Sequence, residues 1–153
     1  MLPTPIFSTR EMVTCFEAIC QDFFKGAAEQ FPIAAASDEF YYFPQVTSPT
    51  KDWSRWDNFS ADAIDDFAAK LSGYERELSR ISTDSMEGLE ENLDLEIDIS
   101  FLQSTIQTLR EQLTAVRHWE QQPTFHLTIA CLGITEALES TDPSAAELRA
   151  ESL

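Results

Sequence analysis

Apolar residues recur at intervals of three and four over most of this sequence, which is the spacing of one face of an α-helix. The first such run starts after Ser8, which stands three residues before Glu11 as in a capping box. Its apolar positions continue to Phe31, and Pro32 follows where a helix would stop. The pattern therefore predicts a first helix over about residues 9–30.

Residues 32–59 break this pattern and are rich in proline and aromatic side chains. A structureless connection of this length is uncommon inside a compact domain. We therefore expect an ordered but irregular segment that is pinned onto the helices by its large rings. These are Phe40, Tyr41, Tyr42, Phe43, Trp53, Trp56 and Phe59.

Helical patterns resume at Ser60 and continue to the end of the chain. The second helix should end in a hairpin at residues 82–88, and the third should cover about residues 85–119. A fourth helix should begin near Pro123, a residue tolerated in a first turn, and it is apolar almost all round. A partial fifth helix should follow, with Pro143 in its first turn.

The third helical pattern carries two apolar stripes, which predicts contacts on two sides, as in a central member of a bundle. One stripe contains Leu89, Leu93 and Ile97. The other contains Leu95, Ile99, Leu102, Ile106, Leu109, Leu113 and Val116. The predicted fold is an all-α, antiparallel bundle of four main helices plus a partial fifth, as a single domain over residues 1–153.

The charge balance argues against several classes of partner. Ten basic residues stand against 27 acidic ones, which gives a net charge of −17. Such a surface repels a phosphate backbone and an anionic membrane, so we expect neither nucleic-acid nor membrane binding. A solvated acidic surface is the simplest interpretation of this charge, and attraction to a basic partner is the alternative.

The cysteines and the ends of the sequence favour a cytoplasmic location. Cys15, Cys20 and Cys131 lie within apolar helical patterns, which predicts reduced and buried thiols. The first residues lack the basic region and apolar core of a signal peptide. No apolar run reaches the length of a membrane span.

Motifs for catalysis or metal binding are missing from the sequence. His118 and His126 are eight residues apart with Pro123 between them, which is not the spacing of a zinc helix. Cys131 and His126 are five apart, a poor spacing for one helix face. We predict no catalytic residue, no metal site and no cofactor, and we interpret the stretch "WEQQPTFHL" at 119–127 as a junction between helices.

Two features could still form a site. Acidic residues of the third helix suit either paired carboxylates or a solvated face, and they are Glu87, Glu90, Glu91, Asp94, Glu96 and Asp98. The aromatic segment at 40–59 suits either ligand or partner contact or a structural wrap. Its candidate surface residues are Tyr41, Tyr42, Trp53, Arg55 and Trp56.

Residues 31–45, 53–81 and 93–138, in this layout, resemble the N-terminal helical region of the bacterial family catalogued as domain of unknown function 885. The junction formed by Trp119, Pro123 and the helix pattern from Phe125 is similar to the tryptophan–proline–helix junction of that family. Complete members look like helical zinc metallopeptidases whose zinc motif lies far downstream. The resemblance implies that this chain is an N-terminal fragment or a short relative of such a protein, without the zinc-motif half.

Three functions follow as expectations. The first is a non-catalytic scaffold, or a substrate-covering N-terminal portion, of a larger metallopeptidase-like protein. The second is an acidic interaction module for a basic partner, and the third is a small ligand-binding bundle that uses residues 40–59. We also expect the apolar fourth helix to be partly uncovered, so that a second copy or the remaining domain of a larger chain could cover it.

Overall fold

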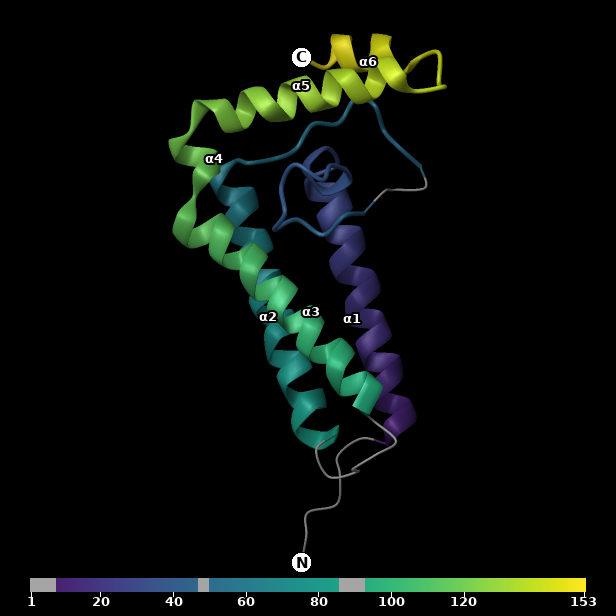
Figure 1. The fold of residues 1–153 in the computed structure, drawn as a ribbon, viewed down its shortest axis with the longest axis vertical. Helices are drawn as coiled ribbons and strands as arrows, with labels where there is room; N and C mark the ends of the chain where they lie inside the picture. The colour runs from purple at the N-terminus through teal and green to yellow at the C-terminus, as the bar shows by residue number, and fades with distance from the viewer. Residues whose placement is uncertain (1–7, 47–49, 86–92) are drawn as a thin grey trace, which may run out of the picture.

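A computed structural model describes residues 8–46, 50–85 and 93–153, and all regular elements in these ranges are helical. The all-α helical fold is therefore confirmed. Three helices form a bundle along the long axis of the molecule, as Figure 1 shows. They are α1 (Thr9–Gln30), α2 (Ala61–Ser85) and α3 (Leu93–Glu111).

Local signals set the bounds of α1. The Ser8 hydroxyl accepts a hydrogen bond from the Glu11 amide at 3.4 Å, and the Ser8 amide donates to the Glu11 carboxylate at 2.7 Å. This is the predicted capping box, which pairs two amides that would otherwise lack a partner. At the other end the Phe31 amide still donates to the Ala27 carbonyl before Pro32 stops the helix.

One face of each long helix forms the core. The buried side chains include Phe23 and Ala27 of α1, Leu71 and Leu78 of α2, and Ile99, Leu102, Ile106 and Leu109 of α3. An ion pair of 3.1 Å between Arg110 and Glu75 joins α3 to α2 at the edge of this core. The second predicted stripe of α3 therefore packs as expected.

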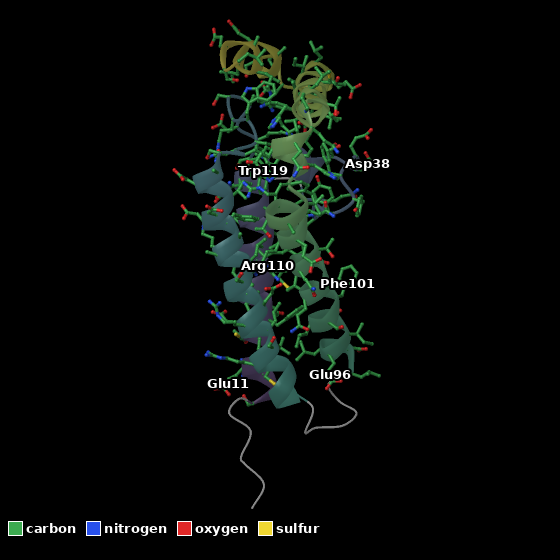
Figure 2. All side chains as sticks on the ribbon, turned by 90° about the vertical axis from the view of Figure 1, so that its left-hand side faces the viewer. Glu11, Asp38, Glu96, Phe101, Arg110 and Trp119 are labelled. Carbon is green, nitrogen blue, oxygen red and sulfur yellow. The ribbon has the colours of Figure 1, made fainter. Side chains whose placement is uncertain are left out.

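The first predicted stripe of α3 faces solvent. Leu93 and Ile97 are exposed, and the neighbouring Phe101, labelled on α3 in Figure 2, is 75% exposed. The prediction of contacts on two sides is wrong for this face in the described chain, because no fourth helix lies alongside α3. Leu89 lies outside the described residues.

The predicted third helix is interrupted before residue 119. A π-helical turn, η2 (Gln112–Val116), ends at Arg117, which has a left-handed backbone with φ 54°. The short helix α4 (His118–Gln121) follows, and the Trp119 indole N–H donates to the Leu113 carbonyl at 2.9 Å. That hydrogen bond helps to hold the chain in the turn between α3 and α5, which Figure 1 shows at α4.

Two helices, α5 (Pro123–Glu139) and α6 (Ala145–Glu151), lie across one end of the bundle in Figure 1. Pro123 occupies the first turn of α5, as predicted. The inner face of α5 is buried at residues spaced four apart, Phe125, Ile129, Gly133 and Ala137. None of the helices in the described ranges is both long enough and apolar enough to cross a membrane.

The connection between α1 and α2 fills the space between the bundle and α5. It contains the short 3₁₀ helix η1 (Ala34–Ala36) and is otherwise irregular over its described residues. The rings of Phe40 and Phe59 lie 5.0 and 4.9 Å, between centroids, from the ring of Phe125 on α5. For residues 32–46 and 50–59, the prediction of an ordered segment pinned by its aromatic rings is confirmed, except at Tyr41, which is 80% exposed.

Gly133 offers a sharp test of this packing. A Cβ atom at this position would lie 2.7 Å from the end of Ile33 and 2.9 Å from the ring of Trp56. We expect Gly133→Ala to lower the free energy of unfolding by about 1–3 kcal/mol, because the core would be overpacked. Chemical denaturation checks this value.

Gly73→Ala on α2 is the matched control, because its Cβ would meet only Arg76 at 3.9 Å. We expect this variant to be more stable by about 0.5–1 kcal/mol, since alanine favours the helix more than glycine does. Equal effects of the two substitutions would contradict the close packing at Gly133.

Candidate functional site

A buried arginine lies between two tryptophans where the connecting segment meets α6. Arg149 is only 1% exposed. Its guanidinium carbon lies 5.7 Å from the Trp53 ring centre and 4.7 Å from that of Trp56. Arginine is suited to this position because its planar cation stacks on aromatic faces and is weakly hydrated.

Hydrogen bonds fix the two indoles and the arginine. The Trp53 indole N–H donates to Asp142 at 3.1 Å, and that of Trp56 donates to the Ser152 hydroxyl at 2.9 Å. Arg149 donates through Nη1 to the backbone carbonyl of Arg55. Its Nε and Nη2 are buried and have no hydrogen-bond partner in the described part of the chain. We call Trp53, Trp56 and Arg149 the tryptophan–arginine cluster.

A half-buried carboxylate organises the same segment. Asp57 accepts hydrogen bonds from the amides of Ile33 at 2.7 Å and Ala34 at 2.9 Å. Burial raises the pKa of Asp57 to about 6, although these hydrogen bonds and the positive charges of Arg149 and Lys51 act in the opposite direction. Asp57 therefore ties the end of the segment to the turn that follows α1.

Lys51 lies next to the Trp53 ring of the cluster. It forms an ion pair with Glu136 of α5, and its amine lies 5.1 Å from the centre of the Trp53 ring. Burial, with a smaller contribution from Arg149, lowers the pKa of Lys51 to about 8. This ion pair is a direct polar link between the connecting segment and α5.

A cavity of about 330 Å³ adjoins Lys51, at the low end of the range for small-molecule sites. Its charged lining residues carry both signs, and they are Glu29, Lys51, Asp52, Arg55 and Glu136. Such a lining can form hydrogen bonds with a small polar molecule.

The structure separates the predicted surface residues into two groups. Trp53, Trp56 and Arg55 meet around Arg149, and of these Arg55 also lines the cavity. Tyr42 is buried beside Phe43 in the core, whereas Tyr41 is 80% exposed. Any binding role of these five residues stays a prediction.

Sequence reasoning missed Arg149, Lys51 and Glu136 as members of this region. Arg149 stands four residues after the buried Ala145, a spacing that places both on one helix face. That spacing is the one sequence signal for the burial of Arg149. It is a weak signal, because a charged side chain is normally exposed.

The two histidines and the acidic run of the third helix are the remaining candidates for chemistry. The His126 ring pairs with the Trp119 carbonyl, and His118 lies in α4. In the ranges that the structure describes, no three His, Cys, Asp or Glu side chains gather where they could hold a metal ion. Glu87, Glu90 and Glu91 of the predicted acidic run lie outside these ranges, while Asp94 and Asp98 are exposed.

The outer face of α5 carries a stripe of exposed apolar side chains. Leu127 is 64% exposed, Ile134 39% and Leu138 69%, and the exposed Cys131 lies between them. Their spacing of four, three and four residues is that of a coiled-coil seam. The prediction that Cys131 is buried is wrong, because nothing in the described chain covers this face. We call these residues the α5 stripe.

No family model, curated protein or solved structure matches this chain.

The buried arginine yields a direct test of the tryptophan–arginine cluster. We expect Arg149→Ala to lower the free energy of unfolding by about 2–4 kcal/mol, through lost packing and a lost hydrogen bond. Arg149→Lys should recover less than half of this loss, because an ammonium group lacks the planar face that stacks on the two rings. Urea denaturation monitored by tryptophan fluorescence measures both.

Arg80→Ala on the exposed face of α2 is the control, and its effect should stay within about 0.5 kcal/mol. If Arg149→Ala were as mild as this control, the cluster would not hold α6 in place.

Proposed function

We propose that this chain is a non-catalytic helical scaffold that binds an apolar helix of a protein partner through the α5 stripe. The carrying observation is the stripe itself, with large apolar side chains exposed at coiled-coil spacing on one helix. Single exposed apolar residues are normal on a protein surface, but a contiguous apolar face marks an interaction site. The seam spacing suits a helix as the partner element.

The inner face of α5 supports this proposal. Its contacts with Ile33 and Trp56 at Gly133 hold the helix close to the connecting segment, and the Lys51–Glu136 ion pair adds a polar link. A helix that is already fixed in place loses little conformational freedom when a partner binds its other face. The scaffold therefore presents the stripe in a preorganised form.

Two further expectations from the sequence, one about the larger protein and one about location, fit within this proposal. As an N-terminal portion of a larger metallopeptidase-like protein, the chain would use the stripe against the remaining domain. A cytoplasmic location agrees with the thiols of Cys15, Cys20 and Cys131, which form no disulfide.

The acidic-module alternative differs in its response to salt. Attraction between a chain of net charge −17 and a basic partner weakens as ionic strength rises. Binding through an apolar stripe persists or strengthens under the same conditions. A salt series on any complex of this chain therefore separates the two functions.

The proposal is tested by comparing the two faces of α5. We expect the double variant Leu127→Gln/Leu138→Gln, at dilute protein concentration, to change the free energy of unfolding by less than about 1 kcal/mol, because both positions are exposed. Ile129→Ala on the inner face should cost about 2–4 kcal/mol. A hydrophobic fluorescent dye should bind the wild type more strongly than the double variant.

A loss of stability in the double variant equal to that of Ile129→Ala would show that the stripe is buried within the fold. The proposed function would then fail.

A further inference from the structure

We propose that the helix bound by the α5 stripe is α5 of a second copy of this chain, packed antiparallel about a two-fold axis. This inference rests on the proposed function and names the partner. It is carried by the symmetry of the stripe and by the distribution of charge along α5.

The stripe is self-complementary when it is reversed. The intervals from Leu127 to Cys131, to Ile134 and to Leu138 are four, three and four residues, and this order reads the same in both directions. An antiparallel two-fold pairing therefore sets Leu127 against Leu138 of the second copy, and Cys131 against its Ile134. A two-fold interface requires this kind of match, because both subunits use the same patch.

Charge favours the antiparallel direction. The acidic residues of α5, Glu136 and Glu139, both lie in its last turn, and the helix contains no lysine or arginine. A parallel pair would bring the two Glu139 carboxylates to the same end of the dimer, whereas Glu136 lies toward the inner face and is paired with Lys51. The antiparallel pair instead places Glu139 beside the opening turn of the other helix, where Thr124 and His126 lie and the helix dipole is positive.

The low charge of α5 also matters for the whole molecule. Two copies of net charge −17 repel each other, and α5 is a face on which they can meet with few acidic residues. Its 17 residues span roughly 25 Å, so the buried area is modest and the dimer should be concentration-dependent. Added salt screens the repulsion and should tighten the dimer.

The exposed stripe of α3 fits a second copy less well. Its residues, Leu93, Ile97 and Phe101, are each four positions apart. A row of side chains at this constant interval turns gradually around the helix and does not form a straight seam like that of α5. This stripe also begins directly after residues 86–92, which the structure does not describe. It serves as the control surface in the experiment.

Cys131 reports directly on the proposed pairing. The centre of the stripe lies midway between Cys131 and Ile134, one and a half residues from Cys131. The two Cys131 residues of an antiparallel pair would therefore be offset by roughly 4.5 Å along the helices. Helix axes in contact are roughly 8–10 Å apart. A short bis-maleimide should therefore join the two copies.

The experiment combines sedimentation equilibrium with cross-linking of the full chain in a Cys15→Ser/Cys20→Ser background. We expect a monomer–dimer equilibrium that tightens with sodium chloride and a cross-linked dimer that forms through Cys131. Leu127→Gln/Leu138→Gln should raise the dissociation constant at least about 100-fold and abolish the cross-link. Phe101→Gln, and separately Ile97→Gln, on α3 should change neither.

Other outcomes overturn the inference in distinct ways. A monomer at all concentrations, with a stable and dye-binding wild type, would reject the second copy but leave the scaffold intact. Dimers that survive the α5 substitutions and are lost with Phe101→Gln would place the contact on α3. Open-ended oligomers would indicate a head-to-tail contact between different faces, and dissociation by salt would indicate charge-driven association.

Discussion

The packing of the connecting segment against the inner face of α5 is the contact on which the rest of the arrangement depends. Trp56 and Ile33 approach the backbone of α5 at Gly133, where the absence of a side chain allows close contact. Phe40 and Phe59 approach Phe125 near the start of the same helix. Because α5 lies on this segment, across the end of the bundle rather than beside α3, its outer face remains exposed (Figure 1).

Two charged groups in the same layer, the buried Arg149 and the half-buried Asp57, add directional contacts to the apolar packing. Arg149 is held between two rings and by a backbone carbonyl, and Asp57 is held by two backbone amides. Burying a charge costs free energy unless it is paired and hydrogen-bonded, so such groups tolerate few alternative positions. They therefore help to fix how α6 and the connecting segment meet.

The sequence predicted those features that depend on neighbouring residues. The bounds of α1 are marked by residues within one helical turn of its ends, namely Ser8, Glu11 and Pro32. The start of α5 is marked in the same way by Pro123. The break at Arg117 is not visible in the sequence, because the apolar period of α3 continues through the π-helical turn to Val116, the residue directly before it. The burial of Arg149 and the exposure of the α5 stripe depend on contacts between distant segments, which periodicity does not encode. Trp53 and Trp56 were recognised as important, but their partner on α6 was not.

Hydrogen exchange measured by NMR on the backbone amides of α5 tests most directly whether this helix is fastened to the bundle. We predict that the amides of Ile129, Gly133 and Ala137 exchange with opening free energies within about 1 kcal/mol of those of Leu102 and Ile106 in α3, as in one cooperative unit. Exchange of the α5 amides at rates typical of a frayed terminus, while the α3 amides stay protected, would contradict the account.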